Sequence, residues 1–257
     1  MRIARLLAAL CLLLTIGAAE APRPRVVLAA TPISRMDLHW WRTRFDEKQA
    51  ELKRAPPQLV FYGDSITENW ERHGPPDWMD FAPVWQRFYG DRHAINLGFI
   101  GDTTANLLWR IEHGETDGIS PKVAVILIGA NNLGRVHWST EETLDGIAAI
   151  VHELKKRLPQ TKLLLLSILP SDRSPWATET TIAVNRALAA TYRDLPGVTF
   201  LDVSHVFMSG SVLTRALYYD PKETPPGAPL HPTAQGQALL SAAIEPTLAS
   251  LLGDRRH

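Results

Sequence analysis

Five short apolar segments recur along this chain of 257 residues, and they constrain its fold more than any other feature. Val, Ile and Leu dominate these segments, and polar residues do not alternate with them as they would on a half-exposed strand. Such runs are typical of strands buried on both faces of a parallel sheet. The five predicted strands span residues 59–62, 94–97, 123–128, 163–169 and 198–201. Helical patterns separate them, which predicts an α/β fold of repeated βαβ units.

Three of the intervening segments carry helix signals. Ser139 and Glu142 form a capping-box pair at the start of a segment whose apolar residues recur at every third or fourth position. Two further helices are expected over residues 178–192 and 232–252. Pro232 suits a first helical position, because proline lacks the N–H that is unpaired there in any case.

The first 21 residues have the features of a secretory signal peptide: arginines precede an apolar run that ends in small residues. Because Gly17 and Glu20 break the run before the ~20 residues of a spanning helix, an uncleaved anchor is only the alternative interpretation. Cleavage would give a periplasmic or secreted protein with no stable membrane insertion. Residues 22–36 are predicted to form an N-terminal arm or tether, and residues 37–253 a single domain.

The composition argues against several classes of partner. Lys and Arg number 27 and Asp and Glu also number 27, so no basic surplus is available to neutralise a nucleic acid. The nine histidines are scattered, without the His-Glu-x-x-His motif of a metalloprotease helix. The chain also lacks the Gly-x-Ser-x-Gly elbow of the α/β-hydrolases. The sequence therefore predicts no nucleic-acid partner, no metal and no cofactor.

Residues that could carry out chemistry follow the first three predicted strands and precede the last helix. Ser65, Gly101 and Asn131 follow the first, second and third strands. The carboxyl ends of parallel strands meet at one edge of a sheet, where open α/β sheets bind their ligands. His231 precedes the last helix, from where an imidazole could reach a serine. Each residue alone is also an ordinary turn or cap residue, so only their combination indicates nucleophilic catalysis.

These residues stand in four blocks that resemble those of the GDSL/SGNH hydrolase family, in particular the branch with the catalytic subunits of platelet-activating-factor acetylhydrolase and their bacterial relatives. The blocks are residues 63–65 (Gly-Asp-Ser), 98–104, 129–132 and 231–233. The resemblance implies a flavodoxin-like three-layer α/β/α sandwich with a five-stranded parallel sheet, and it makes residues 37–253 an SGNH hydrolase domain. It also implies that Ser65 is the nucleophile and His231 the base. The oxyanion hole would comprise the Ser65 amide, the Gly101 amide and the Asn131 side chain.

The third member of the expected catalytic triad is missing from its usual place. The family carries an aspartate three residues before the catalytic histidine, and this chain has Ala228 there. Asp220 or Glu223 could fold back to replace it, or a main-chain carbonyl near Ala228 could accept the proton of Nδ1. We favour the carbonyl, because prolines between residues 225 and 229 stiffen the loop. A degenerate site is the third interpretation.

The sequence thus predicts a serine esterase that cleaves a small acyl group, with acetyl expected, from a carbohydrate or similar ester. Trp138 and Trp176 follow the third and fourth predicted strands and could stack on a sugar ring. A non-catalytic glycan-binding or assembly protein on the same fold is the alternative that Ala228 suggests. Within the enzyme class, a lysophospholipase or thioesterase is a further alternative, and the sequence predicts neither chain length nor oligomeric state.

Overall fold

The structure is a computed structural model that describes residues 26–255. The predicted signal peptide, residues 1–21, lies outside the described residues, as does the beginning of the predicted arm. Within residues 26–255, none of the helices combines the length and the apolar character needed to cross a membrane.

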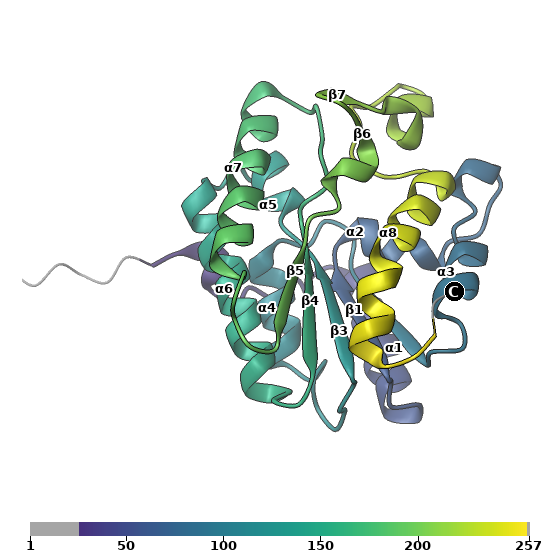
Figure 1. The fold of residues 1–257 in the computed structure, drawn as a ribbon. Helices are drawn as coiled ribbons and strands as arrows, with labels where there is room; N and C mark the ends of the chain where they lie inside the picture. The colour runs from purple at the N-terminus through teal and green to yellow at the C-terminus, as the bar shows by residue number, and fades with distance from the viewer. Residues whose placement is uncertain (1–25, 256–257) are drawn as a thin grey trace, which may run out of the picture.

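The core of the fold is a five-stranded parallel sheet (Figure 1). Its strands are β1 (Leu59–Gly63), β2 (Ala94–Gly98), β3 (Val123–Leu127), β4 (Lys162–Leu166) and β5 (Val198–Leu201). Their order is β2-β1-β3-β4-β5, the flavodoxin-like order, in which the chain direction across the sheet reverses between β1 and β3. All five strand predictions are confirmed, although β4 leaves the sheet three residues earlier than its apolar run ends.

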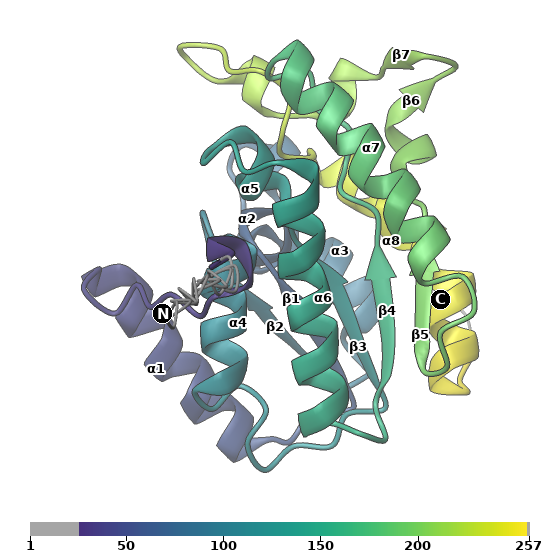
Figure 2. The same cartoon turned by 90° about the vertical axis from the view of Figure 1, so that its left-hand side faces the viewer.

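Helices cover both faces of this sheet and complete the predicted three-layer sandwich (Figures 1 and 2). One layer holds α4 (Thr104–Glu112), α6 (Thr140–Arg157) and α7 (Pro175–Thr191), and the other holds α3 (Ala82–Tyr89) and α8 (Ala234–Leu252). Strands β1 and β3 are buried at every position, and β2 and β4 at all but the first, which explains why their sequences do not alternate; β5, at the edge of the sheet, is fully buried only at Val198. A short antiparallel hairpin, β6 (Met208–Ser209) and β7 (Val212–Leu213), lies beyond β5.

The capping signal before α6 is confirmed, and the prediction for Pro232 is wrong. The Ser139 hydroxyl accepts a hydrogen bond from the Glu142 N–H, and the Glu142 carboxylate accepts one from the Ser139 N–H. The last helix, by contrast, is capped by Thr233 and begins only at Ala234. Pro232 instead forms an antiparallel bridge with Tyr218, so an extended backbone pairing takes the place of a first helical turn.

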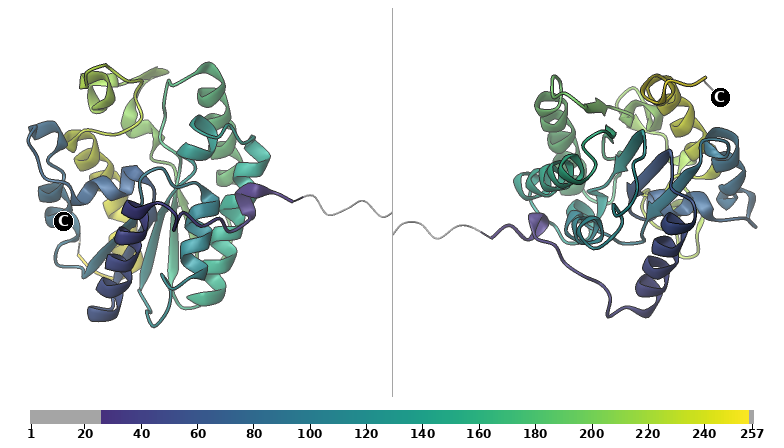
Figure 3. Two further views of the ribbon diagram at one scale, coloured as in Figure 1. Left: turned by 180° about the vertical axis from the view of Figure 1, so that it is seen from behind. Right: turned by 90° about the horizontal axis from the view of Figure 1, so that it is seen from below.

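Residues 26–36 of the predicted arm pack on the outer side of α4 and α6 (Figure 3). The Ala29 carbonyl accepts a hydrogen bond from the Thr104 hydroxyl, and Ile33 exchanges backbone and side-chain hydrogen bonds with α4. Gly146 of α6 permits this contact, because a Cβ there would lie 2.5 Å from the Ala29 carbonyl oxygen. Helix α1 (His39–Arg54) follows and packs beside α4 through tilted contacts of Trp41 and Phe45 with the Trp109 ring.

Candidate active site

Ser65 occupies the turn where β1 passes into α2 (Ser65–Glu68), at the carboxyl edge of the sheet. The Asp64 carboxylate caps this short helix by accepting a hydrogen bond of 3.0 Å from the Ile66 N–H. Ser65 is therefore the first helical residue, where a backbone N–H has no intrahelical acceptor. Among residues 26–255, the Ser65 N–H has no hydrogen-bond partner, so it is available to a ligand.

His231 lies against Ser65, as the sequence predicts, although 166 residues separate the two. The Ser65 Oγ and the His231 Nε2 are 2.9 Å apart, a hydrogen-bond distance. An extended segment directly before α8 places the imidazole, because the Tyr219 N–H donates to the His231 carbonyl and the Thr233 N–H to the Leu217 carbonyl. The Tyr219 ring also stacks on the imidazole, with centroids 5.2 Å apart and planes 10° from parallel.

Asp220 is the partner of His231, so the preference for a main-chain carbonyl is wrong. The Asp220 Oδ1 lies 2.6 Å from the His231 Nδ1. The physical reason is the antiparallel bridge between Tyr218 and Pro232, which places Asp220 beside His231 before the stiff Pro-rich loop begins. The prolines follow Asp220, and their stiffness therefore does not restrict its approach.

Asp220 is also held firmly by the backbone. Its second oxygen, Oδ2, accepts hydrogen bonds from the N–H groups of Leu230, at 2.8 Å, and His231, at 2.7 Å. Burial acts to raise the pKa of Asp220, but the hydrogen bonds and charge of His231 and these backbone donors outweigh it and hold the pKa below its ordinary value. The carboxylate therefore stays ionised beside the imidazole.

The remaining predicted residues, Gly101 and Asn131, come from the ends of β2 and β3. Gly101 has φ +73° and lies in a tight turn closed by a hydrogen bond from the Asp102 N–H to the Phe99 carbonyl. The Asn131 Nδ2 donates to the Asp102 carbonyl at 3.0 Å and lies 3.4 Å from the Asp64 Oδ2. The structure thus links Asn131 to the glycine turn and to the residue before Ser65.

Buried charges surround these groups. Burial has the largest effect on the pKa of Asp64 and raises it to about 6, although the Ile66 backbone N–H and the positive charge of His231 act to lower it. Burial also lowers the pKa of Arg173, although the carboxylates of Asp64 and Asp220 act to raise it. The Arg173 guanidinium donates to the Ala130 carbonyl, directly before Asn131. Arg173 belongs to none of the four motif blocks, so no sequence signal marks it as part of the site.

The tryptophans considered for sugar stacking lie near this edge. Trp176, at the start of α7, is 38% exposed, and its ring lies 5.4 Å from the His137 ring. Trp138 is half-buried before α6. Neither observation tests stacking on a sugar, which stays a prediction. Within the described residues, no cluster of three or more His, Cys, Asp or Glu side chains could hold a metal ion.

A five-stranded parallel sheet with these groups at one edge defines the SGNH hydrolase class of fold. The chain belongs to the GDSL-like lipase/acylhydrolase family, whose model matches residues 61–239. It is 32% identical over 169 residues to the platelet-activating factor acetylhydrolase IB subunit alpha2 of Gallus gallus, covering 65% of this chain and 69% of that protein.

Two solved structures have the same fold. A GDSL-like lipase from Bacteroides thetaiotaomicron superposes with a TM-score of 0.61 at 22% identity, over 81% of this chain and 97% of its own. An acetylxylan esterase from Geobacillus stearothermophilus superposes with a TM-score of 0.57 at 19% identity, over 78% of this chain and 96% of its own.

Proposed function

We propose that this protein is a serine esterase that hydrolyses acetyl esters, with an acetylated carbohydrate or a similar small ester as its substrate. The single observation that carries this proposal is the hydrogen-bonded chain from the Ser65 Oγ through His231 to Asp220, with distances of 2.9 and 2.6 Å. Nucleophile, base and orienting acid in such a chain are the arrangement that activates a serine.

In the proposed mechanism, Asp220 holds the proton of His231 on Nδ1, which leaves the Nε2 lone pair facing the hydroxyl of Ser65. His231 then takes the Ser65 proton as Oγ attacks the ester carbonyl, and it returns that proton to the departing alcohol. Water then attacks the acyl carbon while the same imidazole takes its proton; the acyl group leaves as the free acid, and the proton returns to the Ser65 Oγ. The proton, the acyl group and the alcohol are all accounted for without a cofactor.

The negative charge that develops on the substrate oxygen needs hydrogen-bond donors. We assign this role to the Ser65 N–H, the Gly101 N–H and the Asn131 Nδ2. Two features support the assignment: both backbone N–H groups lack a partner among residues 26–255, and the Asn131 Nδ2 is oriented by one hydrogen bond of 3.0 Å to the Asp102 carbonyl while its second hydrogen makes only a long contact of 3.4 Å with Asp64, which a substrate oxygen would replace. Removal of one such donor costs about 10²–10³ in kcat in a serine protease.

The choice of acetyl rests on the similar proteins, because one is a platelet-activating factor acetylhydrolase subunit and another is an acetylxylan esterase. The predicted signal peptide, residues 1–21, supports action in the periplasm or outside the cell. A polysaccharide or glycan fragment would be available there, which agrees with the proposed carbohydrate ester.

Hydrolysis of p-nitrophenyl acetate by wild type and by Ser65→Ala tests the proposal directly. We expect the variant to retain less than about a thousandth of the wild-type kcat, since it lacks the nucleophile. Equal rates would remove Ser65 from the mechanism. A series of p-nitrophenyl esters from acetate to decanoate then separates a small-acyl esterase from a lysophospholipase or thioesterase.

A fluorophosphonate probe separates an enzyme from a binding protein that has only the fold. An activated serine reacts with the probe, so we expect stoichiometric labelling of wild type at Ser65. Ser65→Ala is the matched control. An unlabelled but folded wild-type protein would favour the non-catalytic alternative.

A further inference from the structure

The turn that carries Gly101 has its backbone polar groups occupied at every position but one. The Phe99 N–H donates to the Gly63 carbonyl, and the Phe99 carbonyl accepts from Asp102. The Ile100 N–H donates to the Glu68 carboxylate at 2.6 Å, and the Ile100 carbonyl accepts from Arg35 at 2.8 Å.

The last two residues of the turn complete this pattern. The Gly101 carbonyl accepts from Arg135 at 3.1 Å, and the Asp102 carbonyl accepts from the Asn131 Nδ2. Within the part of the chain that the structure describes, only the Gly101 N–H lacks a partner in the segment from Phe99 to Asp102. The surrounding side chains thus fix the turn and leave its one free donor available.

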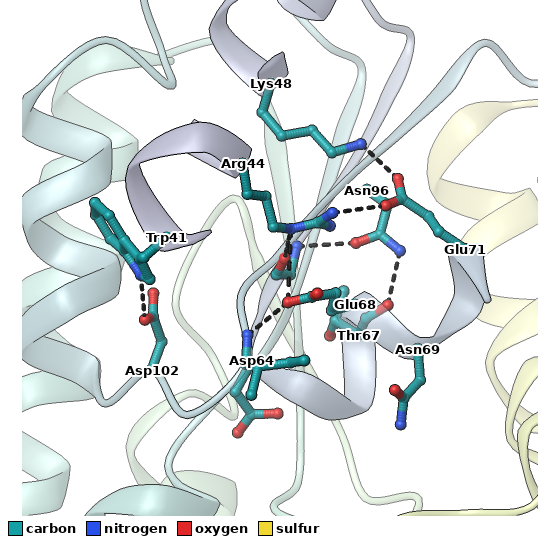
Figure 4. A network of polar contacts seen from close by, with 12 residues as sticks. Trp41, Arg44, Lys48, Asp64, Thr67, Glu68, Asn69, Glu71, Asn96 and Asp102 are labelled. Carbon is teal, nitrogen blue, oxygen red and sulfur yellow. Dashed lines mark hydrogen bonds and ion pairs between the residues drawn. The ribbon is translucent and has the colours of Figure 1, made fainter. Parts of the chain in front are cut away.

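Much of this support comes from outside the segment that matches the family model, residues 61–239. From the arm, the Arg35 guanidinium reaches both the Ile100 carbonyl and the Asp102 Oδ1, the latter at 3.0 Å. From α1, Trp41 donates its Nε1–H to the same Asp102 oxygen at 2.8 Å, and Arg44 donates to the Gly98 carbonyl at 2.8 Å (Figure 4).

Asp102 is the residue on which the contacts of Arg35 and Trp41 converge. Its carboxylate is fully buried and also accepts a hydrogen bond of 2.8 Å from Arg110, which is itself fully buried. Arg110 in turn donates to the Gly63 carbonyl, two residues before Ser65. A buried carboxylate is stable only when it is paired and hydrogen-bonded. Because the side chain of Asp102 is held in this way, its backbone is fixed as well. The Asp102 carbonyl in turn orients Asn131, and Gly101 directly precedes Asp102 in the chain.

We infer that the N-terminal arm and α1 are part of the catalytic apparatus, in which Arg35 and Trp41 act through Asp102 as positioning residues for the oxyanion hole. The inference rests on the proposed function, because it assigns a task to donors that the proposed mechanism uses. Hydrogen-bond donors that are already oriented before the reaction stabilise the transition state without having to move during it. A group misplaced by about 1 Å can cost a hundredfold in rate.

The test uses the double variant Arg35→Gln/Trp41→Phe in the full chain. Phenylalanine keeps an aromatic ring beside Phe45 and Phe99 but removes the N–H that reaches Asp102. The matched control is Arg42→Gln, on the same helix: Arg42 is exposed, and its side chain makes no hydrogen bond to the turn from Phe99 to Asp102.

We expect the double variant to lose about ten- to a hundredfold in kcat on p-nitrophenyl acetate, with little change in KM, because ground-state binding does not need the oxyanion donors. The inhibition constant of a trifluoromethyl ketone, whose hemiketal adduct with Ser65 carries an oxyanion, should rise by a similar factor. Arg42→Gln should leave kcat and this inhibition constant within twofold of wild type.

Each outcome gives a clear answer. An active wild type with a fully active double variant overturns the positioning role and leaves the proposed function standing. A loss of kcat without weaker binding of the ketone also overturns it, as does an equal loss in Arg42→Gln, because any change of charge on α1 would then lower the rate. A wild type that neither hydrolyses esters nor reacts with the fluorophosphonate contradicts the proposed function itself.

Discussion

Replacement of Asp220 by asparagine should inactivate the protein by reversing the imidazole tautomer. The N–H groups of Leu230 and His231 both point at one Asp220 oxygen, so an asparagine must place its own oxygen there. Its amide nitrogen then faces the His231 Nδ1 and donates to it. The ring proton is consequently held on Nε2, which can no longer accept the proton of Ser65.

The size of the expected loss of kcat follows from a comparable enzyme. The equivalent change in a serine protease lowers kcat by about 10⁴. We therefore expect Asp220→Asn to lower kcat by about 10³–10⁴, which corresponds to about 4–5.5 kcal/mol of transition-state stabilisation. The backbone hydrogen bonds at this position are retained, so the thermal unfolding temperature should change much less than the rate.

Initial rates on p-nitrophenyl acetate, with circular dichroism melting curves for each variant, measure both quantities. Glu223→Gln is the matched control, because Glu223 is exposed and lies three residues away in the same loop. The reasoning would be refuted by an Asp220→Asn variant within tenfold of the wild-type kcat. A comparable loss in Glu223→Gln would show that the loop tolerates no change of charge, and it would refute the tautomer argument as well.

Three further predictions concern stability. The pKa of Asp64 is raised from 3.8 to about 6, so the folded state binds more protons than the unfolded state between these pH values. Above pH 6 the buried carboxylate is ionised and destabilises the fold, so Asp64→Asn should be more stable than wild type by up to about 3 kcal/mol. Urea unfolding measures this difference, and a difference that does not shrink toward pH 4 would contradict the argument. Gly146→Ala should cost about 1–3 kcal/mol in thermal unfolding, because its Cβ would lie 2.3 Å from the Thr104 Oγ1 and 2.5 Å from the Ala29 carbonyl oxygen; an unchanged melting temperature would show that both neighbours can move away freely. Arg92→Met should cost about 3–5 kcal/mol in urea unfolding, because Glu245 would lose a bidentate buried partner, and a loss below 1 kcal/mol would count against that ion pair.

Much of the fold followed from local sequence. Unbroken apolar runs define strands that are buried on both faces, and the order of runs and helical patterns defines a parallel sheet. Ser65 and Asn131 could be located because a residue directly after a parallel strand lies at the carboxyl edge whatever the rest of the chain does. The end of β4 and the start of α8 were misplaced, since apolar residues continue past Leu166 and Pro232 pairs across to Tyr218.

The amino-acid sequence alone indicated the sheet, the serine, the glycine turn and the asparagine, because each lies in or shortly after an apolar strand segment, and it indicated the histidine by its motif block before the last helix. Only the tertiary structure decided which carboxylate faces His231 and which side chains hold the turn at Gly101. Asp220 reaches the imidazole through a bridge between two extended segments, and Arg35 and Trp41 reach Asp102 from more than 60 residues away. Hydrogen bonds between distant segments leave no periodic pattern in the sequence, so their partners are fixed by how the layers pack.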